Sequence, residues 1–144
     1  MPDSMTIFDE WLRRKLERRS VTIRETREVS HVHRRAAGPR SVYAAIQLRV
    51  EPAAALAISC DVQWPNGERA ADYVSCITDG VLDELLARDV GPAVTLVRIT
   101  VISIDFHPVD SSPHAFYIAT RAATREGLQR EDGTSNIDWS IRAE

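Results

Sequence analysis

The residue types that could carry out acid–base chemistry fall at two places in this 144-residue chain. His33 lies in a basic run, whereas His107 and Asp110 lie in a turn that follows a long apolar segment. A histidine near a carboxylate is a common pairing in general acid–base catalysis. Asp110, however, is better suited to capping a following helix, and His107 to standing exposed on the turn. We therefore expect no catalytic site.

The remaining histidines and the cysteines do not suggest a metal or thiol site. His31 and His33 would share one face of an extended segment, but no third ligand follows at a suitable spacing, so we expect no metal. Cys60 and Cys76 lack the basic or helix-start surroundings that lower a thiol pKa, so we expect reduced core thiols.

Nucleotide chemistry is not expected either. The chain has no G-x-x-x-x-G-K-[ST] motif to cradle a phosphate, and no glycine- and serine-rich phosphate loop of the kind that small-molecule kinases use. We therefore predict no GTP hydrolysis and no cofactor.

Charge is distributed unevenly along the chain. Residues 1–50 carry 11 Lys/Arg against 6 Asp/Glu, whereas residues 51–144 carry 7 against 15. A basic half on an acidic protein indicates a face that meets an anion. The densest basic stretch is predicted to be a loop, and its donors suit phosphate oxygens: His33, Arg34, Arg35 and Arg40.

Hydrophobic periodicity predicts the elements that would position these groups. The predicted strands are Val21–Val29, Ser41–Val50, Leu56–Trp64 and Val94–Phe106. The predicted helices are about Glu68–Arg88 and Ser112–Leu128. Amphipathic strands that alternate with two helices favour an α+β two-layer sandwich.

The two helices carry local signals. Asp110, Ser111 and Ser112 can each accept a hydrogen bond from the first free N–H groups of the second helix, and Pro113 suits its first turn. In the first helix, Gly80 would cost about 1 kcal/mol against alanine. We expect that glycine where the helix lies close to a strand.

The N-terminal segment, about Ile7–Arg19, is predicted to be an added amphipathic helix with one apolar stripe made of Phe8, Trp11, Leu12 and Leu16. We favour packing of this stripe on the body of the domain or on a second copy; a basic helix laid on nucleic acid or a membrane is the alternative. The C-terminal segment from about residue 129 is polar, with Ile137 and Trp139 as anchors for a last short strand.

Four motif blocks, in order, resemble domain IV of elongation factor G. His107-Pro108-Val109-Asp110-Ser111-Ser112 with Ala115-Phe116 is similar to that family's Y-H-x-V-D-S-S-x-x-A-F signature. The others are Arg24-Glu25-Thr26, the set His33, Gly38 and Tyr43, and the set Gly67, Asp72-Tyr73 and Gly80-Val81. The chain departs from the family at Ala36-Ala37, Pro39, Ser41 and Ala44, where the family has Gln-Ser and glycines.

The resemblance implies a ribosomal-protein-S5 domain-2-like fold over residues 21–128, flanked by the helix at 1–20 and a tail at 129–144. That fold has a four-stranded sheet with two helices on one face and a left-handed βαβ crossover. It also implies non-catalytic binding of ribosomal RNA or the ribosomal A site by a tip made of His33, Arg34, Arg35, Arg40 and His107. The alternative is a protein-interaction or self-associating module that reuses the fold through the N-terminal stripe.

No apolar run approaches membrane-spanning length, and charge begins too early for a signal peptide. We therefore expect a cytoplasmic protein with no membrane partner.

Overall fold

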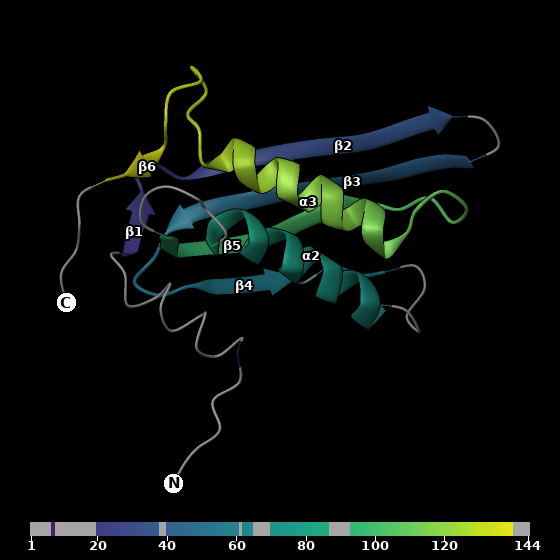
Figure 1. The fold of residues 1–144 in the computed structure, drawn as a ribbon, viewed down its shortest axis with the longest axis horizontal. Helices are drawn as coiled ribbons and strands as arrows, with labels where there is room; N and C mark the ends of the chain where they lie inside the picture. Colours follow the sequence, from purple (N-terminus) through teal and green to yellow (C-terminus); the bar gives the residue numbers. More distant parts are fainter. Residues whose placement is uncertain are drawn as a thin grey trace, which may run out of the picture.

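The computed structural model describes residues 7, 20–37, 40–60, 62–64, 70–86 and 93–139. Its elements are β1 (Ser20–Ile23), β2 (Arg27–Ala37), β3 (Arg40–Pro52), β4 (Ala57–Cys60), α2 (Ala70–Leu86), β5 (Ala93–Asp105), α3 (Pro113–Gly127) and β6 (Ile137–Asp138). Both helices lie side by side on one face of the sheet (Figure 1). The predicted α+β architecture with two helices is confirmed.

The sheet is larger than predicted. Its strands follow the order β2-β3-β5-β1-β6, and β4 also pairs with β5. β4 and β1 run parallel to β5, whereas β3 is antiparallel to both β2 and β5. The prediction of four strands is therefore wrong: the described residues form six. The left-handed crossover between β4 and β5 stays a prediction.

The extra strands have identifiable causes. The single strand predicted at 21–29 is broken at a bend, because the N–H groups of Arg24 and Glu25 turn away from the ladder and donate to Asn136. β1 and β2 therefore become separate strands. The short strand expected near Ile137 is present as β6, which pairs antiparallel with β1.

The core lies between the sheet and the two helices. Alternate residues of β3 and β5, including Leu48, Val50, Ile99 and Val101, are buried against the helical layer. α2 contributes Ile77, Val81 and Leu85, and α3 contributes Phe116, Ala119 and Ala123. This period of two on the strands and of three to four on the helices is what the sequence pattern predicted.

Gly80 allows the helices, not a helix and a strand, to approach closely. A Cβ at Gly80 would lie 2.9 Å from the Tyr117 carbonyl oxygen and 3.1 Å from the Cβ of Thr120, both on α3. The expectation of a nearby strand was wrong because helix periodicity identifies a buried position without identifying its neighbour. In the described part of the chain, no helix has the length and apolarity to cross a membrane.

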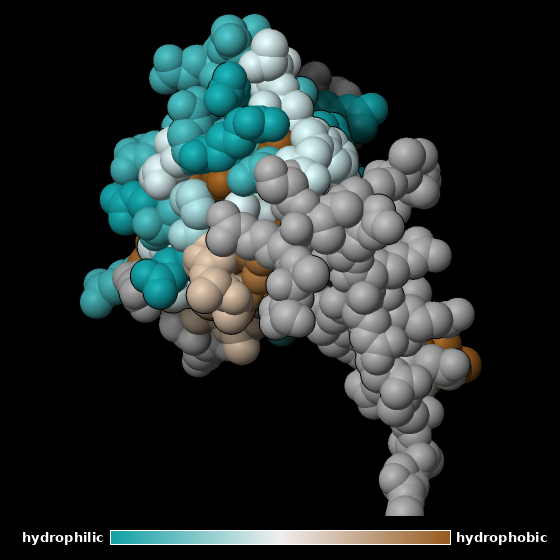
Figure 2. Space-filling view, turned by 90° about the vertical axis from the view of Figure 1, so that its left-hand side faces the viewer, coloured by the Kyte–Doolittle hydropathy of each residue, from teal (hydrophilic) through white to brown (hydrophobic). Residues whose placement is uncertain are grey.

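The two ends of the sheet differ in the segments that meet there. We call the tip the end where the β2–β3 hairpin and the β5–α3 connection (residues 106–112) lie together (Figure 1). We call the base the opposite end, where β1, β6, the bend at residues 24–26 and residues 128–136 meet. Viewed from the base, the upper part of the molecule is largely hydrophilic (Figure 2).

Candidate nucleic-acid interface

The β5–α3 connection is fastened to β3 by backbone groups and one hydroxyl. The Tyr43 N–H donates to the Asp110 carbonyl oxygen at 3.2 Å, and the Ser111 hydroxyl donates to the Tyr43 carbonyl oxygen at 2.7 Å. The same Ser111 hydroxyl oxygen accepts from the His107 N–H at 2.8 Å. The turn is therefore held to the hairpin without using the side chains of His107 or Asp110.

One ring nitrogen of His107 is bonded within the turn, and the side chain as a whole is exposed. Its Nδ1 accepts from the N–H groups of Val109 and Asp110 at 3.3 and 3.2 Å, so this hydrogen-bond pattern assigns the ring proton of the neutral form to Nε2. The side chain is 52% exposed. His107 thus presents an N–H donor to solvent at the end of the molecule.

Ser112, not Asp110, caps α3. The Ser112 hydroxyl oxygen accepts from the Ala115 N–H at 3.1 Å, and Pro113 begins the first turn, as predicted. Asp110 was expected to share this capping role, but it lies too early in the chain to reach the first free N–H groups. Its carboxylate lies instead 3.6 Å from the Nδ1 of His107, beyond hydrogen-bond distance.

On the open face of the sheet, Arg34, Tyr43 and Asp105 form a row. The Arg34 guanidinium lies over the Tyr43 ring, 5.6 Å from its centroid. The Tyr43 hydroxyl donates to Asp105 at 2.6 Å, and this hydrogen bond, aided by burial and the carboxylate charge, raises the pKa of Tyr43. Because β3 and β5 pair Ala45 with Asp105, the register brings these groups together.

A cavity of about 360 Å³ opens at the tip beside this row. Its lining includes three of the predicted site residues, Arg34, Arg35 and His107, together with Tyr43, Asp105, Phe106 and Asp110. Tyr43 and Asp105 were not predicted to belong to the site. Their pairing follows from the β3–β5 register, which cannot be obtained from either strand alone.

The stretch predicted to be a basic loop is instead the end of the hairpin. β2 continues to Ala37, and Arg34 and Arg35 pair with Tyr43 and Val42 of β3. The loop prediction was wrong because a run of charged side chains lacks the sequence pattern of a strand, although pairing with β3 stabilises one here. Arg40 begins β3, but its side chain lies outside the described part, so its role stays a prediction.

His33 lies apart from the cavity, on the face of β2 that the helices cover. Its strand partner, Ala44, is fully buried. Burial lowers the pKa of His33, and the neighbouring His31, Arg35 and His114 lower it further. The alternation of the strand explains why His33 and Arg34, though adjacent in sequence, point to opposite faces.

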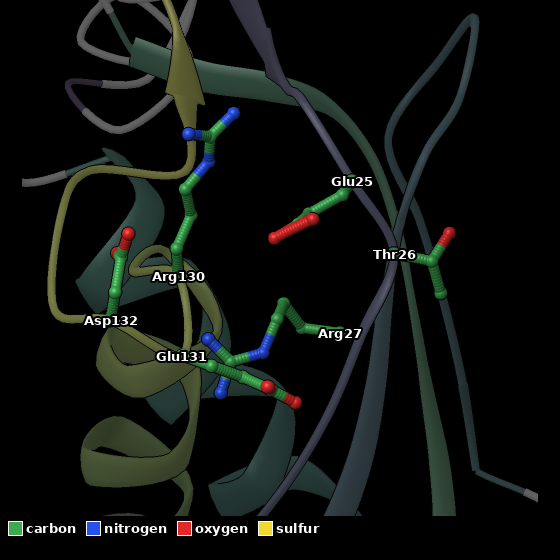
Figure 3. A pocket seen from close by; sticks show the side chains of 6 residues that line it. All are labelled: Glu25, Thr26, Arg27, Arg130, Glu131 and Asp132. Carbon is green, nitrogen blue, oxygen red and sulfur yellow. The ribbon is translucent and has the colours of Figure 1, made fainter.

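The base contains a larger hollow, of about 590 Å³, with a different chemistry. Glu25 points into it, Arg27 approaches Glu131 across it, and Thr26 points away (Figure 3). Arg130 and Asp132 complete its lining. The lining holds three carboxylates against two arginines. Arg27 already donates to the Gln129 carbonyl oxygen, so the hollow offers no excess of positive charge to an anionic ligand.

The Arg24-Glu25-Thr26 motif has a structural role at the base. Asn136 is fully buried; its Oδ1 accepts from the Glu25 N–H at 3.1 Å, and its amide donates to the carbonyl oxygens of Glu25 and Gly127 at 2.9 and 3.1 Å. Arg24 donates to the Ile137 carbonyl oxygen at 3.3 Å. These bonds tie the bend to the chain that follows α3.

Other candidate groups do not form a site. Among the described residues, no group of three His, Cys, Asp or Glu side chains could hold a metal ion. No disulfide joins Cys60 and Cys76, and burial together with Asp79 and Asp72 raises the pKa of Cys76, which disfavours a reactive thiolate. The apolar stripe of Phe8, Trp11, Leu12 and Leu16 lies outside the described residues, so its partner-binding role stays a prediction.

Comparison with known proteins agrees with this architecture. The family model described as elongation factor G, domain IV, matches residues 19–131. The elongation factor G of Paracoccus denitrificans is 30% identical over 128 residues, covering 85% of this chain and 18% of that protein. The elongation factor G of Rhodopseudomonas palustris is 33% identical over 106 residues, which cover 72% of this chain and 15% of that protein.

The crystal structure of a protein from Thermus thermophilus shares the fold, with a TM-score of 0.63 at 24% identity over 74% of this chain and 16% of that one. The fold and the matched sequence are those of a translation-factor domain. The chain belongs to the elongation factor G domain IV family, and it spans less than a fifth of the length of these relatives.

Proposed function

We propose that this chain binds ribosomal RNA, at the ribosomal A site or a structure like it, through its tip. The observation that carries the proposal is that Arg34, Arg35 and His107 line one cavity at the end of the molecule. Both arginines are exposed, and His107 adds an outward N–H donor. Such donors suit phosphate and base oxygens.

The tip would act by occupying space and not by chemistry. Its turn is held by Ser111 and by the Asp110 carbonyl oxygen, so it can enter a groove without rearrangement. Membership in a translation-factor domain family supports this role. Ribosome binding would also fit the cytoplasmic location that the sequence predicts.

The test is co-sedimentation of the purified chain with ribosomes at two salt concentrations. We expect pelleting that weakens with salt, because each neutralised phosphate releases counterions, with a logarithmic slope near about −0.7 per phosphate on single strands. The double variant Arg34→Ala, Arg35→Ala should lose pelleting at low salt.

A matched control removes the same charge from the part of the open face that lies away from the tip. In Arg49→Ala, Arg98→Ala, both arginines lie on β3 and β5 away from the tip, and Arg49 loses only an exposed pair with Glu28. This variant should pellet nearly as well as the unmodified chain. The proposal would be wrong if the two double variants pelleted with ribosomes to the same extent, or if pelleting of the unmodified chain did not depend on salt.

A further inference from the structure

The carboxylates of the tip cavity are at odds with a purely phosphate-binding surface. Asp105 and Asp110 line the same cavity as Arg34, Arg35 and His107. A phosphate placed there would meet two negative charges at close range. A ligand that offers N–H donors as well as a flat, neutral body would instead find partners among all of these groups.

Asp105 and Asp110 differ in their freedom to accept such donors. Asp105 already accepts the Tyr43 hydroxyl at 2.6 Å and so fixes the Tyr43 ring. The Asp110 carboxylate accepts no hydrogen bond from another described residue, and the Nδ1 of His107 lies 3.6 Å from one of its oxygens. The Asp110 side chain is 27% exposed and lines the cavity.

The rest of the cavity offers flat surfaces. The Arg34 guanidinium and the Tyr43 ring lie one over the other, and Phe106 also lines the cavity. Phe106 is itself held by edge-on contacts with Trp64 and Tyr73, at centroid distances of 6.3 and 5.4 Å. Unstacked bases in RNA loops are commonly held by stacking on aromatic rings and guanidinium planes.

We propose, resting on the RNA binding proposed above, that the tip cavity takes an unstacked guanine from a single-stranded RNA segment. Guanine offers two adjacent donors on its Watson–Crick edge, N1–H and the N2 amino group, and a single carboxylate accepts both. Asp110 accepts this pair, while the base stacks on the Arg34 guanidinium, which itself lies over the Tyr43 ring. Arg35 remains available for a neighbouring phosphate.

The test measures fluorescence anisotropy of labelled RNA heptamers, UUUXUUU, with guanosine, inosine, adenosine or uridine at the centre. Inosine lacks the N2 amino group but keeps N1–H. We expect the guanosine heptamer to bind about tenfold more tightly than the uridine heptamer, with inosine between them.

The variant Asp110→Asn should separate base recognition from charge. It should remove the guanosine preference, because an amide no longer accepts two donors, yet bind the uridine heptamer as well or better, since one negative charge is gone. Asp79→Asn is the control, because Asp79 is an exposed residue of α2. It should keep the guanosine preference.

Three results would overturn the inference. They are equal affinity for the four heptamers, an Asp110→Asn variant that strengthens all four equally, and no heptamer binding at low salt. None of these refutes ribosome binding, which the Arg34 and Arg35 double variant tests separately; salt-dependent but base-indifferent binding would leave that proposal standing.

Discussion

The tip and the base of this sheet both carry motifs of the elongation factor G domain IV family, and both place arginines beside carboxylates. At the base, Arg24, Arg27 and Asn136 direct their polar side chains to backbone carbonyl oxygens. At the tip, backbone groups and Ser111 hold the turn, and His107 keeps a donor exposed. The difference separates a motif whose polar side chains are used within the fold from one that leaves a donor exposed.

The largest effect should come from the base. Asn136→Ala removes three hydrogen bonds, one buried and two partly buried, and leaves backbone groups of Glu25 and Gly127 without these partners, so we expect a loss of about 3 kcal/mol in the free energy of unfolding. Urea denaturation measures this. Glu131→Gln, an exposed change on the same segment, should alter it by less than about 0.5 kcal/mol. A comparably small loss in Asn136→Ala would mean that the base is not held in this way.

A smaller effect on stability, but a larger one on binding, is expected at the tip. Ser111→Ala should lower the free energy of unfolding by about 1 kcal/mol, since one hydroxyl group with two partners is lost. RNA binding should fall further than this change in folding explains, because the turn that carries His107 is released. Denaturation and ribosome pelleting of the same variant report the two quantities.

Ser103→Ala provides the matched control for that variant. Ser103 donates to the Gln47 side chain at 3.1 Å on the open face of β5, away from the tip cavity. Its loss should leave ribosome pelleting intact. If both serine variants weaken pelleting equally, the turn does not have the special role assigned to it.

The smallest effect concerns pH, and it should distinguish the two ends. The folded-state pKa of His33 lies below its ordinary value of 6.5, so the unfolded chain binds more protons as pH falls below that value. Stability should therefore decline modestly from about pH 7.5 to about pH 5.5, and His33→Gln should reduce the decline. Thermal melting at the two pH values tests this.

The contribution of the base to stability should not change between about pH 7.5 and about pH 5.5. Hydrogen bonds from Thr134 lower the pKa of Asp132, so its contribution is complete above the ordinary carboxyl pKa of about 4 and is lost only as pH falls through the lower folded value. Asp132→Asn should leave the change between those two pH values unaltered. A reduced change in that variant would contradict the separation of the two ends.

Local sequence signals predicted the two helices and the Ser112–Pro113 start of α3, because capping and periodicity depend on neighbours in the chain. The three predicted residues that line the tip cavity came instead from the basic stretch and from the resemblance to the family. The bend that separates β1 from β2 could not be predicted, since it depends on Asn136, which lies 111 residues after Glu25. Nor could the Tyr43–Asp105 pair, which depends on a register shifted by an irregularity between Gln47 and Leu48. These features belong to pairings between distant segments.

One strand joins the two ends. β5 begins at Ala93 beside β1 at the base and ends at Asp105 beside the tip cavity, a length of about 40 Å for 13 residues. A force applied at the tip along the axis of this strand would act on many of its interstrand hydrogen bonds at the same time, in shear. It would not break these hydrogen bonds one after another. A force met at the tip would therefore be shared among the hydrogen bonds that β5 makes with β1, β3 and β4, and one continuous strand would carry it to the base.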